Sequence, residues 1–200
     1  MKKLSFLFVL GLLAACQTLP TSSEWLARGD GYAKDGKLDA AIKSYTRAAT
    51  LNPKDASIYA ARGAAYFTKG EYALATQDFI ETLQLNPYHV DTYNALATAL
   101  AVQGDYKNAM EMINRVLLVA PDKPEIFFTR GGINFMLGKY NQAVQDYSFV
   151  LNTHPAADVY QARAMAYAKL GDTKKSQADI QAAQSGKYME KLSDYQLLRK

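Results

Sequence analysis

The sequence has a single cysteine among 200 residues, which excludes two common structural supports. A lone thiol cannot form an internal disulfide, and it supplies too few ligands for a zinc site. The two histidines, His89 and His154, have no nucleophile or carboxylate constellation beside them. Glycine-rich phosphate loops, His-Glu-x-x-His and Gly-x-Ser-x-Gly motifs are also missing. We therefore expect no enzymatic activity, no cofactor and no metal site.

A long apolar run is missing as well. The stretch 4–13 is apolar except for Ser5 and Gly11, and it falls short of the roughly 20 residues of a spanning helix. Lys2 and Lys3 precede it and small residues follow it, which is the layout of a secretory signal peptide. The alternative is an uncleaved hydrophobic N-terminus with Cys16 as an incidental buried residue.

The segment Leu13-Ala14-Ala15-Cys16 resembles the lipobox of bacterial lipoproteins. The resemblance implies a signal peptide at 1–15, lipid transfer to the Cys16 thiol, and acylation (palmitate) of the new amino terminus. Several acyl chains give stable membrane anchoring, whereas one is marginal. Gln17 replaces the Asp that usually retains such lipoproteins in the inner membrane. The resemblance thus implies an outer-membrane anchor facing the periplasm of a Gram-negative bacterium, with 16–21 as a short tether.

A strong charge excess is also lacking. The formal charge is +4, and removal of Lys2 and Lys3 with residues 1–15 leaves about +2. No block of like charges is present. We therefore do not expect nucleic acid as a partner.

What the sequence does have is a period of 34 residues. Prolines and glycines recur in register, and so do an aromatic position and two small positions. The recurring positions are Pro53, Pro87, Pro121 and Pro155; Gly36, Gly70, Gly104, Gly138 and, one residue early, Gly171; Trp25, Tyr59, Tyr93, Phe127 and Tyr160; Gly29, Gly63, Ala97, Gly131 and Ala164; and Ala41, Ala75, Ala109, Ala143 and Ser176. The glycine suits a left-handed end of a first helix, and the proline follows a second helix. Such a period predicts stacked helix pairs.

This pattern resembles the tetratricopeptide repeat over 22–185. The resemblance implies an all-α, right-handed superhelical solenoid of about five helix pairs. Residues 186–200 continue with a helical stripe formed by Tyr188, Leu192, Tyr195 and Leu198, which predicts a C-terminal capping helix. A homodimer through this helix is an open alternative.

A second regularity pairs arginine with aspartate across the two helices of a unit. We expect three such pairs to set helix register: Arg62 with Asp78, Arg130 with Asp146, and Arg163 with Asp179. In the first unit Ser44 stands opposite Arg28, and Glu24 is the expected i,i+4 partner of Arg28.

In proteins of the repeat family the first helix of each unit lines a concave groove that binds protein segments. Transfer of the groove positions to this chain gives Phe67, Asn94, Val102, Phe128, Gly132, Phe135, Met136 and Met165. Aromatic and methionine side chains there favour a peptide or helix with apolar anchors. The alternative for each residue is packing against the next unit.

The two resemblances together imply an envelope scaffold. The chain is similar to NlpI-type lipoproteins, which bring peptidoglycan enzymes together. The first alternative is a lipoprotein of pilus or secretion-pore assembly (pilotin-like), and the second is an inconspicuous cell-wall enzyme. We favour the peptidoglycan scaffold because the simple five-unit array has no visible pilus-specific extension.

Overall fold

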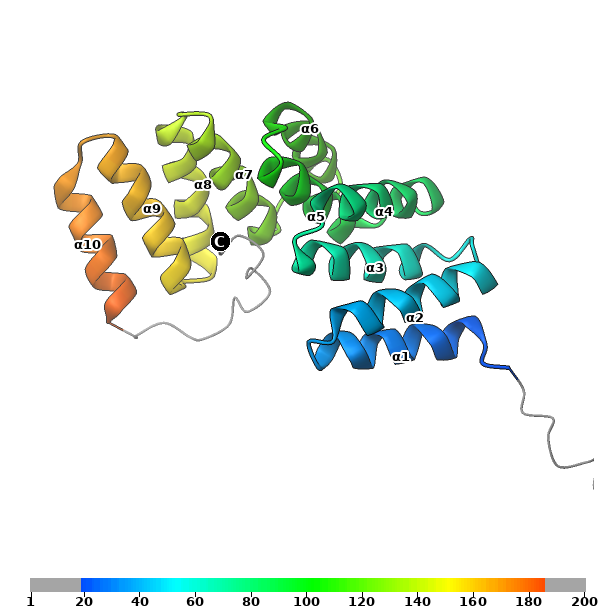
Figure 1. The fold of residues 1–200 in the computed structure, drawn as a ribbon. Helices are drawn as coiled ribbons and strands as arrows, with labels where there is room; N and C mark the ends of the chain where they lie inside the picture. The colour runs from blue at the N-terminus through cyan, green and yellow to red at the C-terminus, as the bar shows by residue number, and fades with distance from the viewer. Residues whose placement is uncertain (1–18, 186–200) are drawn as a thin grey trace, which may run out of the picture.

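In the computed structural model, residues 19–185 are described (Figure 1). The predicted signal peptide at 1–15, Cys16 and the predicted capping helix at 186–200 lie outside this range. The described part consists of ten α-helices and contains no strand. They are α1 (Ser22–Lys34), α2 (Leu38–Leu51), α3 (Ala56–Lys69), α4 (Tyr72–Leu85), α5 (Val90–Val102), α6 (Tyr106–Leu117), α7 (Pro124–Met136), α8 (Tyr140–Thr153), α9 (Ala157–Lys169) and α10 (Thr173–Gln184).

The helices form five antiparallel pairs, each made of an odd-numbered first helix and an even-numbered second helix. The strongest contacts are within a pair, and each second helix then packs on the first helix of the next pair. Figure 1 shows the pairs following one another along an elongated, curving array. The predicted all-helical solenoid is therefore confirmed.

Helix boundaries follow from local chemistry. Thr21 caps α1 in a capping box, in which its hydroxyl accepts from the Glu24 N–H and the Glu24 carboxylate accepts from the Thr21 N–H. Gly70 ends α3 with φ at 87°, a left-handed conformation that costs a residue with a Cβ more. All five glycines that the sequence placed after first helices have positive φ.

The two helices of a pair approach each other most closely at a small residue of the first helix. A Cβ added at Gly63 would lie 2.8 Å from Cε1 of Phe79, the ring that α4 lays across α3. Tyr45 covers Gly29 and Tyr147 covers Gly131 in the same manner. In the third unit the corresponding residues are Ala97 and Ile113, both fully buried, so a methyl group there is matched by a smaller partner.

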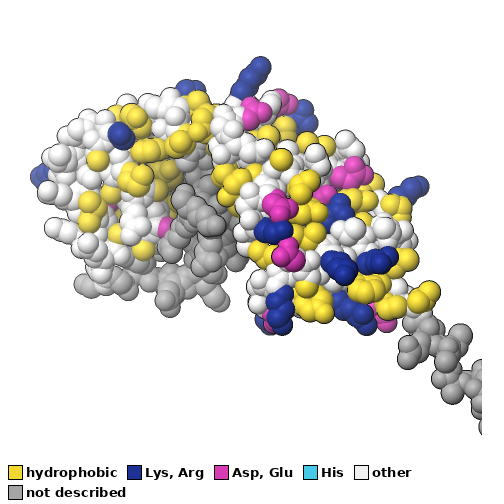
Figure 2. Space-filling model, in the orientation of Figure 1, with side chains coloured by type: hydrophobic (Ala, Val, Ile, Leu, Met, Phe, Trp, Pro, Cys, Tyr) yellow, Lys and Arg dark blue, Asp and Glu magenta, His cyan; other side chains and the backbone are white. Residues whose placement is uncertain are grey.

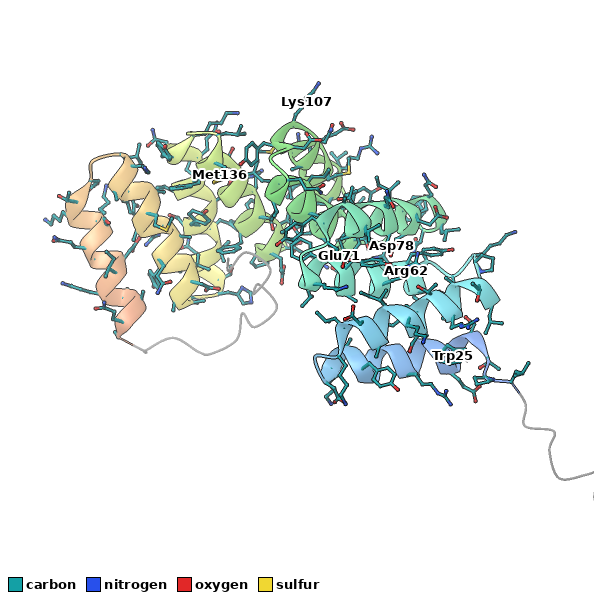
Figure 3. The ribbon with its side chains drawn as sticks, in the orientation of Figure 1. Trp25, Arg62, Glu71, Asp78, Lys107 and Met136 are labelled. Carbon is teal, nitrogen blue, oxygen red and sulfur yellow. The ribbon has the colours of Figure 1, made fainter. Side chains whose placement is uncertain are left out.

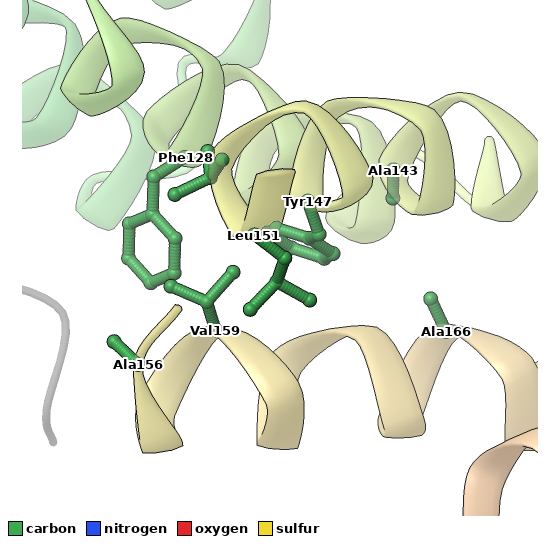
Figure 4. Close-up of a cluster of buried hydrophobic side chains, with 8 residues drawn as sticks. Phe128, Ala143, Tyr147, Leu151, Ala156, Val159 and Ala166 are labelled. Carbon is green, nitrogen blue, oxygen red and sulfur yellow. The ribbon is translucent and has the colours of Figure 1, made fainter. Parts of the chain in front are cut away.

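The core runs along the junctions between units rather than through one centre. Figure 4 shows the cluster between α7, α8 and α9, where Phe128, Tyr147, Leu151 and Val159 meet. A similar cluster joins α5 and α6 to α7 through Ile113, Ile126 and Ile133. Because a helix pair cannot bury its apolar face alone, each unit depends on its neighbours.

One junction differs from the others. Helix α6 packs less extensively on α7 than α2 on α3, α4 on α5 or α8 on α9. The connection there, 118–123, is longer than 52–55, 86–89 and 154–156. In Figure 1 the helices from α7 onward run across the direction of α1 to α4. The solenoid therefore changes course most between its third and fourth units.

The close approach at Gly63 gives a testable prediction. Gly63→Ala should lower the free energy of unfolding by about 1–3 kcal/mol, because the methyl group overlaps the buried Phe79 ring. Adding Phe79→Ile copies the Ala97–Ile113 arrangement and should recover part of that loss. The measurement is urea unfolding followed by circular dichroism.

Gly31→Ala is the matched control, because nothing lies within 4 Å of a Cβ at this α1 position. It should raise the free energy of unfolding by about 0.5–1 kcal/mol through helix propensity alone. A double variant as unstable as Gly63→Ala would show that the ring contact is not the cause.

Candidate partner-binding groove

The first helices line the inner face of the solenoid. Each of α1, α3, α5 and α7 contacts the next first helix, and successive second helices contact each other less. A stack whose first helices are closer together than its second helices curves toward the first helices. The positions of the first helices that point away from the second helices therefore line a groove on the concave side.

Three of the residues predicted to line this groove are exposed. Val102, at the end of α5, is 43% exposed, Met136, at the end of α7, is 61% exposed, and Met165 of α9 is 56% exposed. Figure 3 labels Met136 on its helix. Large apolar side chains in solvent on one face of three consecutive first helices are the main unpartnered feature of this surface.

Two residues of the predicted lining are buried instead. Phe67 is 5% exposed and packs edge-on against Tyr72 at 5.1 Å between ring centroids. Phe128 is 7% exposed and joins Tyr147 and Val159 in the cluster of Figure 4. Their placement in an open groove was wrong, because both rings fill space inside the stack, where burial of a large side chain stabilises the fold.

The remaining three lining residues are half-buried. Phe135 contacts the ring of Tyr140 edge-on at 5.3 Å, so only part of it faces the groove. Gly132 offers a stretch of α7 without a side chain. The Asn94 side-chain oxygen is buried and finds no hydrogen-bond partner within residues 19–185. Buried acceptors are nearly always satisfied in proteins, so this oxygen is a second unpartnered feature of α5.

All three predicted arginine–aspartate pairs form. The Arg62 guanidinium donates through Nε and Nη2 to the two Asp78 oxygens, at 2.8 Å each, and Arg163 binds Asp179 with the same geometry. Arg130 binds Asp146 at 2.6 Å through Nη2 (Figure 3 shows the Arg62 pair). The hydrogen bonds to Asp78 raise the pKa of Arg62.

Each of these arginines also contacts its neighbours. Arg62 lies over the Tyr59 ring at 5.4 Å and donates to the Thr46 hydroxyl of α2 at 3.2 Å. Arg163 likewise lies over Tyr160 and donates to Ser148 of α8 at 2.9 Å. One guanidinium thus joins both helices of its own unit to the second helix of the unit before.

Asn134 explains a departure from the repeat. It stands where other units have tyrosine, and its amide donates to Asp146 at 3.0 Å. Asn134 therefore adds a third donor to a nearly buried carboxylate.

In the first unit, the predicted Glu24–Arg28 pair is replaced by other contacts. The Glu24 carboxylate accepts from Thr21, and the Arg28 guanidinium lies 5.0 Å over the Trp25 ring. The register of this unit is supported by Tyr45, whose hydroxyl donates to Asp30 at 2.8 Å. Burial, reinforced by that bond, raises the pKa of Tyr45.

The third unit lacks the polar network altogether, which the sequence analysis missed. Leu96 and Met112 stand where other units have arginine and aspartate, and Ile80 stands where the preceding unit would offer Thr46 or Ser148. A cavity of about 450 Å³ opens at this place between α4, α5 and α6. This difference could have been found in the sequence, because aligning the units with the 34-residue period shows Ile80, Leu96 and Met112 at the three polar positions.

Charged side chains of both signs lie mainly over α1 to α6 on the face shown in Figure 2, whereas the part over α7 to α9 is largely hydrophobic or uncharged. Among the described residues no group of three His, Cys, Asp or Glu side chains could hold a metal ion.

None of the described helices is long and apolar enough to cross a membrane. His89 lies in a connection, with Nδ1 2.8 Å from the Thr92 hydroxyl.

Comparison with protein families identifies the repeat. Profiles of the tetratricopeptide repeat match residues 29–70, 66–127 and 157–185. No curated protein matches the sequence.

Solved structures give the same fold. A MamA protein matches with 18% identity and a TM-score of 0.70, covering 81% of this chain and 89% of that one. MamA from Desulfovibrio magneticus matches with 16% identity, a TM-score of 0.73 and coverage of 81% and 92%. A tetratricopeptide repeat protein from Parabacteroides merdae matches with 23% identity, a TM-score of 0.73 and coverage of 80% and 63%. At these identities the likeness concerns the fold alone.

The ion pairs give the second testable prediction. Arg62→Leu should lower the free energy of unfolding by about 2–4 kcal/mol, because it leaves the nearly buried Asp78 carboxylate without the two N–H groups that bind it. Arg62→Leu/Asp78→Met reproduces the Leu96–Met112 pair and should cost less than the single change. Urea unfolding measures both.

Glu111→Gln is the control, since its pair with Arg115 is exposed on α6 and should contribute less than about 1 kcal/mol. Equal losses for the single and the double variant would mean that packing of the arginine stem, not the uncompensated charge, causes the effect.

Proposed function

Because the chain is built of tetratricopeptide repeats, we propose that it is a membrane-anchored periplasmic scaffold that binds protein partners through the inner face of its first helices. The observation that carries this proposal is the exposure of Val102, Met136 and Met165 on that face. Apolar side chains gathered on one surface are typical of interaction sites. Methionine is well suited to such a surface because it adapts to partners of different shape.

The groove favours a particular kind of segment. Met136 and Met165 offer contacts for apolar anchors, and Gly132 lets a backbone come close. We therefore infer a partner segment with apolar side chains spaced along it.

The anchor is the second part of the proposal. The lipobox-like segment that ends in Cys16 supports lipid attachment at the outer membrane, on the periplasmic side. Residues 16–21 can span at most about 20 Å, at 3.3–3.6 Å per residue. The groove would then work close to the membrane, and we propose that its partners belong to cell-envelope biogenesis, with peptidoglycan enzymes first. Pilus or secretion-pore subunits are the other class, and the identity of the captured partner decides between them.

In-cell crosslinking followed by mass spectrometry tests the groove. Met136→Glu/Met165→Glu should abolish capture of the main partner, because two carboxylates would be buried against an apolar anchor. Leu74→Glu is the matched control, since Leu74 is an exposed apolar residue on the second helix α4.

Peptidoglycan enzymes captured by the wild type and lost in the double variant would support both the groove and the cell-wall role. A secretin or pilus subunit lost in the same way would leave the groove in place and replace the cell-wall role. Partners retained by the double variant would contradict the groove.

Membrane fractionation with a clickable palmitate analogue tests the anchor. The wild type should incorporate the label and sediment with outer membranes, whereas Cys16→Ser should do neither. A Cys16→Ser variant that stays in the membrane fraction, or an unlabelled wild type, would show that Cys16 is not an anchor.

A further inference from the structure

The cavity between α4, α5 and α6 belongs to the outer side of the solenoid. Two of its walls are second helices, whereas the groove proposed above is lined by first helices. Its function is therefore not part of the partner binding already proposed.

In three other units an arginine–aspartate pair occupies the corresponding place, and in two of them the arginine also contacts the preceding second helix. The guanidinium of Arg62 lies between the Tyr59 ring, the Asp78 carboxylate and the Thr46 hydroxyl. Arg163 repeats this arrangement, and Arg130 lies over Phe127 while it binds Asp146. Arg62 and Arg163 thus each connect two successive second helices.

At the junction of the second and third units all three polar positions are apolar. Ile80 replaces the hydroxyl residue, Leu96 the arginine and Met112 the aspartate, and all three line the cavity. Tyr93 also lines the cavity. In the second unit Arg62 lies over the equivalent ring of Tyr59, but here Leu96 stands in place of the arginine. This junction is therefore apolar at the three positions where the junction of the first and second units has Thr46, Arg62 and Asp78.

If the three apolar side chains simply replaced the polar ones in a packed core, no open space would remain at this junction. Here the side chains do not close the junction, because Ile80 remains 43% exposed and a volume of about 450 Å³ stays open. Open apolar cavities of roughly 300–1,000 Å³ with a few polar groups are typical of ligand sites. The polar groups at this one are Gln84, Asn108 and Arg115.

The surroundings indicate what the cavity accepts. Arg115 is the single charged side chain in its lining, and its exposed pair with Glu111 is weak enough to be exchanged for another carboxylate. Leu118 follows α6 directly, Tyr88 lies in the connection between α4 and α5 next to the lining residue Pro87, and each is 84% exposed. Because Tyr88 adjoins the lining residue Pro87 and Leu118 follows the lining residue Arg115 by three positions, exposed apolar residues continue past the cavity along the chain.

We propose that this cavity is a second binding site, which takes an aliphatic or aromatic side chain of a partner polypeptide with a carboxylate next to it. The apolar side chain packs mainly on Ile80 and Met112, beside the buried Leu96. The carboxylate binds Arg115, and neighbouring residues of the partner contact Tyr88 and Leu118.

Selection of a random peptide display library on the full chain tests the proposal. Enriched peptides should combine a large apolar residue with a nearby Asp or Glu. Their affinity, measured by fluorescence anisotropy, should fall by about tenfold or more in Ile80→Thr/Leu96→Arg/Met112→Asp. This variant rebuilds the Thr46–Arg62–Asp78 network, so it should fill the cavity and keep the helical circular dichroism spectrum.

Further variants keep the result decisive. Ile80→Thr alone changes one partly exposed residue and should weaken the same peptides even if the triple variant fails to fold. Arg115→Gln should remove the preference for acidic peptides, and Met136→Glu/Met165→Glu should leave binding unchanged. The site would be overturned if every enriched peptide were lost in the groove variant, or if the peptides that the groove variant still binds were bound as tightly by the rebuilt chain. Binding of medium-chain fatty carboxylates without enrichment of any peptide would overturn the polypeptide occupant.

Discussion

The solenoid depends on close contact between the two helices of each unit, and a small residue of the first helix makes that contact possible. Gly29, Gly63 and Gly131 each receive an aromatic ring, whereas Ala97 receives the smaller Ile113. The size of one residue is thus matched by the size of the other within the same unit. This match sets the distance between the paired helices, and the distance in turn fixes the surface that each unit offers to the next.

The arginine–aspartate pairs fix the axial register of the two packed helices. A guanidinium has a planar fork that binds a carboxylate in one orientation, so the pair fixes how far the second helix slides along the first. Because Arg62 and Arg163 also reach the second helix of the preceding unit, register is passed along the stack. The third unit has no arginine–aspartate pair and thus no such connection to the second helix of the preceding unit. At its other end lies the junction at which α6 packs least on the next helix.

The fold and the ion pairs could be predicted from the sequence because both repeat with the period of the chain. A position that recurs in register keeps the same neighbours in every unit, so its role follows from its spacing. Phe67 and Phe128 were placed wrongly for the opposite reason: periodicity gives the face of a helix but not how far a ring extends into the adjacent unit. Leu96 and Met112 were visible as breaks in the pattern. The cavity beside them was not, because its volume depends on the rotamers of several helices at once.

The groove and the cavity lie on opposite sides of the stack. Val102, Met136 and Met165 belong to first helices of the third to fifth units, whereas Ile80 and Met112 belong to second helices of the second and third. A segment bound in the groove would therefore not cover the cavity. Since each unit contacts only its neighbours, a polypeptide that stiffens the second and third units would act on the groove mainly through α5, the helix that contributes Leu96 to one surface and Val102 to the other. This shared helix is the physical route by which two occupants could affect each other's affinity.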